Sequence, residues 1–172
     1  MKLENVSVES MDLSFEIATP GVSICQFEEG IQKMTNEKSG KTTLRLPLQI
    51  IQVVEGEEGN IGRSFSLFIP IETSFGEKQL QAILSMTGLL DGFRTKFPDE
   101  IDLLEEEFIN TLAVKLLGKR IRVTHDLRKD QQGKDRVTVL RLEKIAKPAP
   151  TSSRGTATKI PQATQSKAKA DW

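Results

Sequence analysis

Hydrophobic and polar residues alternate along three stretches of the first 75 residues, and this period of two predicts β-strands. The alternation is clearest between residues 44 and 50, where every second position is Leu or Ile and the positions between them are Arg, Pro and Gln. Gly30 interrupts the first stretch, and a glycine within a strand is typical of a bulge or a bend. The three predicted strands cover residues 21–32, 42–54 and 63–71.

After the third stretch the apolar residues recur every three or four positions, which predicts a helical block over about residues 77–117. Its two expected helices cover residues 78–90 and 99–117. The second helix starts among acidic residues and has Lys115 near its end, an order that complements the helix dipole, and Gly118 suits a C-terminal cap. Alternation then returns, and it predicts two last strands over residues 120–124 and 136–145.

Five strands with a helical block between the third and the fourth is the chain order of an OB-fold, a small, partly open Greek-key barrel. We therefore predict a mainly β domain of this fold over residues 18–147. Residues 1–17 are weakly patterned and are predicted to form an N-terminal arm. Residues 148–172 are rich in Pro, Ala, Ser, Thr, Gln and Lys, so we expect a disordered C-terminal tail. OB-folds mostly bind single-stranded nucleic acid or oligosaccharide, although a fold alone does not fix a function.

The composition narrows the class of protein. A single cysteine, Cys25, excludes an intramolecular disulfide and argues against a structural zinc site. No apolar run approaches the ~20 residues of a membrane span, and the first ten residues lack the apolar segment of a signal peptide. We expect a cytoplasmic protein that has no membrane contact and needs no cofactor.

The net charge is zero, but the charges are unevenly distributed. Residues 119–147 hold ten basic and four acidic residues, whereas residues 1–118 hold ten basic and nineteen acidic ones. A basic region of this kind can serve a phosphate backbone even where the average charge is neutral. The alternative is an ordinary solvated strand surface.

No enzyme signature is complete. Gly40-Lys41-Thr42 resembles the end of a phosphate-binding loop, but position 35 is Thr where the motif needs Gly, and a strand follows where it needs a helix. The only histidine, His125, has no nucleophile or carboxylate marked around it, so we interpret it as a strand-end residue. The acidic run over residues 99–107 favours a solvated helix face, with a metal-dependent nuclease as a minor alternative. We predict no catalytic residue and no metal site.

Binding of single-stranded nucleic acid requires cations that meet phosphates and flat side chains that meet bases. Phe68 is a large apolar residue on a strand face otherwise occupied by serines, and it either stacks on a base or is buried under the helical block. A bulge in the last strand would add Arg141 to the outward arginines. The predicted nucleic-acid-binding residues are Lys38, Lys41, Arg45, Phe68, Arg120, Arg122, Arg128, Lys129, Lys134 and Arg136.

Several short motifs resemble those of small bacteriophage proteins that are found with recombination and replication genes and are thought to be OB-fold single-stranded DNA-binding proteins. The resemblance covers about residues 19–145. It implies a protein that coats single-stranded DNA in phage replication or recombination, in the cytoplasm of the host cell. The motifs are Pro20-Gly21, Lys38-Ser39-Gly40-Lys41, Leu44-Arg45-Leu46, Gly62-Arg63, the run from Leu80 to Gly88-Leu89-Leu90, and Leu117-Gly118-Lys119-Arg120-Ile121.

Single-strand binders of this kind often end in an acidic tail with a terminal aromatic residue that recruits partner enzymes. Here the tail is basic until Asp171 and Trp172, so it either recruits replication or recombination proteins through these two residues or contacts DNA. The chain has no tyrosine and one tryptophan, which provides few stacking groups. This shortage favours the alternative function, an OB-fold protein-interaction or regulatory subunit that binds no nucleic acid. The choice between DNA and RNA and the oligomeric state stay open.

Overall fold

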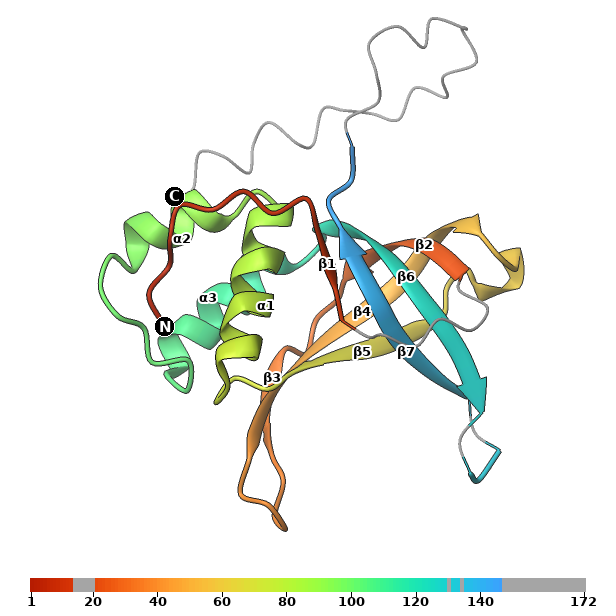
Figure 1. The fold of residues 1–172 in the computed structure, drawn as a ribbon, viewed down its shortest axis with the longest axis horizontal. Helices are drawn as coiled ribbons and strands as arrows, with labels where there is room; N and C mark the ends of the chain where they lie inside the picture. The colour runs from red at the N-terminus through yellow and green to blue at the C-terminus, as the bar shows by residue number, and fades with distance from the viewer. Residues whose placement is uncertain (14–20, 130, 134, 147–172) are drawn as a thin grey trace, which may run out of the picture.

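The computed structural model describes residues 1–13, 21–129, 131–133 and 135–146 (Figure 1). Three helices lie together at one end of an antiparallel sheet, and two long hairpins extend from the lower side of the molecule in Figure 1. The helices are α1 (Ser74–Met86), α2 (Leu90–Lys96) and α3 (Glu106–Leu116), and a short 3₁₀ helix, η1, covers Glu58–Asn60. The strands are β1 (Ser10–Asp12), β2 (Gly21–Phe27), β3 (Gln32–Thr35), β4 (Thr42–Glu55), β5 (Ser64–Ile69), β6 (Arg120–Lys129) and β7 (Asp135–Glu143).

The long strand β4 organises the sheet, whose order is β1-β7-β6-β2-β4-β3 with β5 as an additional partner of β4. Strand β5 occupies one edge of β4, and β2 and β3 share the other edge, because residues 44–45 and 48–49 of β4 pair on both sides. Strands β2 and β3 are thus one strand interrupted by residues 28–31. Gly30 adopts a φ of 98° within this break, a conformation that favours glycine. The bend predicted at Gly30 is confirmed.

The mainly β architecture with helices between the third and fourth predicted strands is confirmed, but the strand count and the closure differ from the prediction. The sheet has seven strands because the first predicted strand is divided and because β1 pairs with β7. Among the described residues, β5 pairs with β4 alone and β7 lies between β6 and β1, so the sheet stays open. The helical block contains a third helix, α2, which was not predicted as a separate element.

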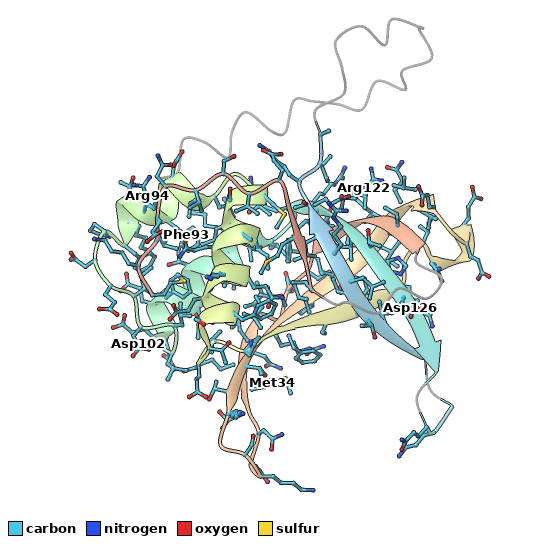
Figure 2. The ribbon with its side chains drawn as sticks, in the orientation of Figure 1. Met34, Phe93, Arg94, Asp102, Arg122 and Asp126 are labelled. Atoms are coloured by element: carbon cyan, nitrogen blue, oxygen red, sulfur yellow. The ribbon has the colours of Figure 1, made fainter. Side chains whose placement is uncertain are left out.

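The core forms where the inward face of the sheet meets the helices. The four alternating Leu and Ile residues of β4 at positions 44–50 are at most 1% exposed, as the pattern predicts. The helices contribute Leu80 and Ile83 from α1 and Leu112 from α3, all fully buried. Phe93, Phe97 and Phe108 form an aromatic cluster with ring centroids 5.5–6.0 Å apart, and Phe93 lies among the helices in Figure 2.

The described part of the predicted N-terminal arm, residues 1–13, runs along α1 and continues into β1 beside β7 (Figure 1). Met1 and Leu3 are buried in the core. Ser85 of α1 accepts a hydrogen bond from the amide of Val8 (2.9 Å) and donates one to the carbonyl of Val6 (3.2 Å). This segment, which we call the N-terminal strap, thereby contacts both the helices and the sheet. The predicted disordered tail, with Asp171 and Trp172, lies outside the described residues.

None of the helices in the described part of the chain has the length and hydrophobicity of a membrane-spanning segment.

Candidate nucleic-acid interface

The side of the sheet that points away from the core carries the predicted binding residues, and we call it the outer face. Residues paired across neighbouring antiparallel strands project to the same side, so the strand register arranges the outer face in rows. The first row crosses β5, β4 and β3 and contains Phe68, Arg45 and Gln32. The second row crosses β5, β4, β2 and β6 and contains Ser64, Gln49, Gln26 and Arg120.

Phe68 is exposed, with 52% of its surface accessible, so the helical block does not cover it. Arg45 is directly opposite on β4, and its Nε donates a hydrogen bond to the Ser66 hydroxyl at 2.8 Å. This bond holds the guanidinium group on the outer face beside the phenyl ring. Met34 of β3, also exposed at 43%, lies on the neighbouring hairpin in Figure 2. A flat apolar group and a fixed cation therefore stand side by side on this part of the sheet.

Arg120 is exposed at the start of β6, in the row of Gln26 and Gln49. Its Nε lies 3.4 Å from Oε1 of Gln26, a long hydrogen bond that leaves the rest of the guanidinium group to solvent. Gln49 donates through Nε2 to the carbonyl of Gly62 at 3.3 Å. Neutral amide side chains of this kind can donate to phosphate and to base edges.

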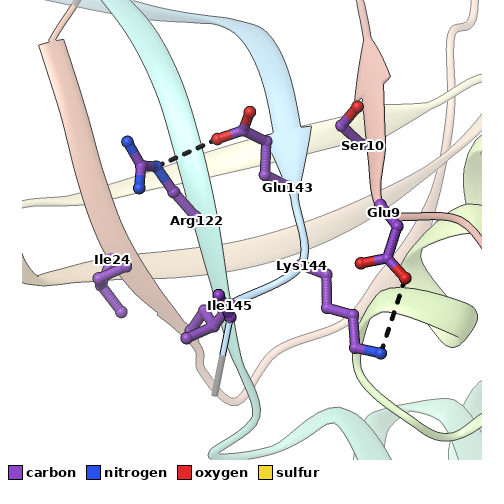
Figure 3. Close-up of a pocket in the computed structure, with 8 residues that line it drawn as sticks. Glu9, Ser10, Ile24, Arg122, Glu143, Lys144 and Ile145 are labelled. Carbon is purple, nitrogen blue, oxygen red and sulfur yellow. Dashed lines mark ion pairs between the residues drawn. The ribbon is translucent and has the colours of Figure 1, made fainter. Parts of the chain in front are cut away.

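The third row crosses β4, β2, β6, β7 and β1. Within this row Arg122 and Glu143 form an ion pair. Nε of Arg122 is 3.1 Å from Oε2 of Glu143 (Figure 3). Lys144 pairs with Glu9 at 3.9 Å, and both pairs line an open pocket of about 390 Å³ together with Ser10 and Ile24. Arg122, which was predicted to contact phosphate, therefore already forms an ion pair with a carboxylate of the same chain.

The two hairpins beside the outer face carry the remaining predicted cations. Lys38 and Lys41 are exposed near the tip of the β3–β4 hairpin, where the Asn36 side chain accepts hydrogen bonds from the amides of Lys38 and Ser39. Arg128, Lys129 and Arg136 belong to β6 and β7 by their backbones, and their side chains lie outside the described part of the structure. Lys134 also lies outside the described residues.

The structure therefore brings Arg45, Phe68, Arg120 and Arg122 onto one face and places Lys38 and Lys41 on an adjoining hairpin. Gln26 and Glu143 also lie on the outer face but were not among the predicted site residues. Glu143 directly follows the buried Leu142, a signal for an outward position, whereas Gln26 shares its strand parity with Val22 and Ile24, so the period alone does not indicate its orientation. The register of β6 and β7 shifts after Thr124, which is the irregularity needed to turn Arg141 outward. Arg141 pairs with Thr124 and projects from the outer face.

The sheet also contains a serine–histidine contact, in which Nε2 of His125 lies 2.9 Å from the Ser23 hydroxyl oxygen. Both residues are buried, with 3% and 1% of their surfaces exposed, so no substrate reaches the serine. Burial lowers the pKa of His125, the nearby Asp126 carboxylate acts in the opposite sense, and Arg63 lowers it further. The contact fits a structural role in the core.

Cys25 and the acidic residues at positions 99–107 differ in their exposure. Cys25 is fully buried, and burial raises its pKa to about 12, so it stays a neutral thiol. The acidic residues between positions 99 and 107 are all exposed, as predicted, but only Glu106 and Glu107 lie on a helix, because α3 starts at Glu106 and not at residue 99 as expected. Among the described residues, no group of three or more His, Cys, Asp or Glu side chains could hold a metal ion.

The chain matches no model of a known protein family and no curated protein sequence.

Proposed function

We propose that this protein binds single-stranded DNA through the outer face, without strong sequence preference, and coats it during DNA replication or recombination. The observation that carries the proposal is the exposed Phe68 ring beside the fixed guanidinium of Arg45, with Arg120 and Arg122 on the same face of the sheet. Aromatic rings that stack on bases, set among cations that follow the backbone, are the usual elements of single-strand binding.

The strand pairing supports an OB-like arrangement. The first predicted strand (β2 with β3) pairs with the second (β4) and the fourth (β6), β4 pairs with β5, and β6 pairs with β7. We propose an OB-type sheet that is left unclosed between β5 and β7. OB-folds bind ligands on the face of strands two and three, between two flanking hairpins. Those strands correspond to β4 and β5, which carry Arg45 and Phe68.

The distribution of charge supports the same face. Four arginines, at positions 45, 120, 122 and 141, project from it, whereas the acidic run over residues 99–107 lies in the helical block. A polyanion would approach the sheet and avoid the acidic side of the helices. Binding should weaken as salt increases, because cations released from the phosphates contribute to the association.

Fluorescence anisotropy with a labelled poly-dT strand of about 30 nucleotides tests the proposal, beside a duplex of equal length and at two salt concentrations. We expect salt-sensitive binding of the single strand and poor binding of the duplex, whose bases are already stacked. A poly-U strand of the same length measures the preference between DNA and RNA. Absence of single-strand binding at low salt would refute the proposal.

Two substitutions separate stacking from charge. Phe68→Ala should weaken binding by ~1–3 kcal/mol and leave the salt dependence unchanged, because only a stacking group is lost. Arg120→Ala should weaken binding and flatten the salt slope by about 0.7, the change expected for one phosphate contact to a single strand. Val114→Ala and Lys96→Ala on the helices are the matched controls, and both should bind as the wild type does.

The second candidate is a protein-interaction subunit. Its support is the exposed apolar surface of Val114 (70%) and Leu117 (48%) on and beside α3, away from the outer face. If single strands do not bind, a pull-down comparing the wild type with Val114→Asp would test this function. Loss of a captured protein in the variant would support it.

A further inference from the structure

Glu143 lies between two arginines on the outer face. Its Oε2 is 3.1 Å from Nε of Arg122 on β6, and its Oε1 is 3.2 Å from Nε of Arg141 on β7. Each oxygen of one carboxylate therefore faces a different guanidinium group. Arg141 also donates from Nη2 to the hydroxyl of Ser10 on β1, at 3.1 Å. Two neighbouring strands, β6 and β7, thus direct guanidinium groups towards one small anionic group, and β1 holds one of these groups through Ser10.

The two ion pairs of Glu143 are partly exposed to solvent, and the one with Arg122 is not a hydrogen bond. The side chains of Arg122 and Arg141 are 38% and 45% exposed, and that of Glu143 is 25% exposed. Nε of Arg122 is buried, yet its approach to Glu143 lacks the geometry of a hydrogen bond. Ion pairs at such exposure contribute little to stability, so a competing anion can replace one of the partners.

A phosphodiester presents the same chemistry as the Glu143 carboxylate, since both offer two oxygens to a pair of guanidinium groups. We propose that Arg122, Arg141 and Ser10 form a site for one backbone phosphate of the bound strand, and that Glu143 occupies this site in the free protein. The phosphate displaces the carboxylate when the strand binds. This inference rests on the proposed single-strand binding and identifies Glu143 as the residue that limits its strength.

Removal of the carboxylate charge tests the inference. Glu143→Gln keeps the size of the side chain and removes the carboxylate charge that pairs with both arginines. The affinity for poly-dT should rise by about tenfold, and the salt dependence should become steeper by about 0.7 for each additional phosphate that the protein neutralises. The measurement is anisotropy of the labelled strand over a series of salt concentrations, with the wild type measured in parallel.

Glu107→Gln is the matched control, because it changes the net charge equally and removes a carboxylate paired with Lys96 at 3.7 Å in the helical block. This control should change affinity less than about twofold, since its charge is remote from the strand and screened by salt. An equal rise in affinity in both variants would overturn the inference, because it would reveal a general charge effect.

The remaining outcomes separate the inference from the function on which it rests. If the wild type binds the strand and Glu143→Gln binds equally or more weakly, the inference fails and the proposed function stands. If neither protein binds at low salt, both fail. Should the variant not fold, nitrogen-15 NMR of the wild type decides the question. The Nε–Hε signals of Arg122 and Arg141 should shift together as poly-dT is added, and unchanged signals would refute the phosphate site.

Discussion

The imidazole ring of His125 is buried in the sheet, and only one of its two nitrogens has a hydrogen-bond partner among the described residues. Ser23 contacts Nε2, whereas Nδ1 is buried and has no hydrogen-bond partner among the described residues. A buried polar atom without a partner costs free energy, and a charged ring at the same place costs more. The native state therefore favours the neutral imidazole, in agreement with the lowered pKa.

This environment predicts a loss of stability in acid. The unfolded chain takes up a proton as the pH falls through 6.5, the ordinary pKa of histidine, and the native state resists protonation until a lower pH. The contribution of the neutral His125 ring to the free energy of unfolding is fully present above about pH 6.5. It disappears as the pH falls through the native pKa, at ~1.4 kcal/mol per pH unit at most. Urea unfolding between about pH 7.5 and pH 5.5 should show this loss for the wild type and a flatter profile for His125→Gln. Parallel profiles would contradict it.

At the scale of elements, the entry into α1 is held very close to the end of β5. Thr73 caps the helix by accepting a hydrogen bond from the amide of Gly76 at 3.0 Å, and its hydroxyl donates to the carbonyl of Pro70 at 2.8 Å. A Cβ atom on Gly76 would lie 2.0 Å from that same carbonyl oxygen. The glycine is therefore required for the approach of the helix to the sheet.

Gly76→Ala should destabilise the protein by about 1–3 kcal/mol or more, because the new methyl group must displace backbone atoms. Helix propensity alone predicts the opposite sign, a gain of up to ~1 kcal/mol. Gly59→Ala in η1 is the control, since no atom lies within 4 Å of its Cβ position and the change should stay within ~0.5 kcal/mol. Denaturant unfolding of both variants measures the difference. Wild-type stability of Gly76→Ala would show that α1 can move away from β5.

For the whole molecule, the sequence predicted the elements whose burial repeats regularly. Strands β4 and β5 were placed within two residues of their observed ends because a sheet buried on one side imposes a period of two. Strand β6 was expected to end at Thr124 but continues to Lys129. His125 and Asp126 are both buried where the register shifts, which breaks the alternation. The three-residue strand β1 is too short to have a period, and it depends on a partner that is far away along the chain.

The sequence also predicted part of the candidate site, namely the orientation of its strand residues. Strand parity placed Arg45, Phe68 and Arg120 on one face, because orientation within a strand is a local property. The sequence did not indicate that Phe68 is exposed, since that depends on where the helices pack. Nor did it indicate the pairing of Arg122 with Glu143, which follows from the register of two strands joined by a hairpin.

The N-terminal strap shows how such long-range contacts stabilise the whole molecule. Its residues form hydrogen bonds with Gln81 and Ser85 of α1, while Leu13 donates to the carbonyl of Leu140 on β7 at 2.7 Å. Without the strap, apolar surface of α1 and the outer edge of β7 would be exposed. Deletion of residues 1–13 should therefore lower the free energy of unfolding by several kcal/mol, at ~1.5–3 kcal/mol for each buried apolar side chain lost.

Hydrogen-exchange measurements show which strands lose stability when residues 1–13 are deleted. The amides of β7 that face β1 should lose protection in the deleted protein, whereas those of β4 should exchange only as fast as the lower global stability requires. Lys2→Ala with Glu4→Ala is the matched control, because both side chains are exposed on the same strap and should contribute little. If the deleted protein unfolds at the wild-type denaturant concentration, the strap is only an appendage. If it is destabilised as expected, the weakly patterned N-terminus is part of the core that joins the helices to the sheet.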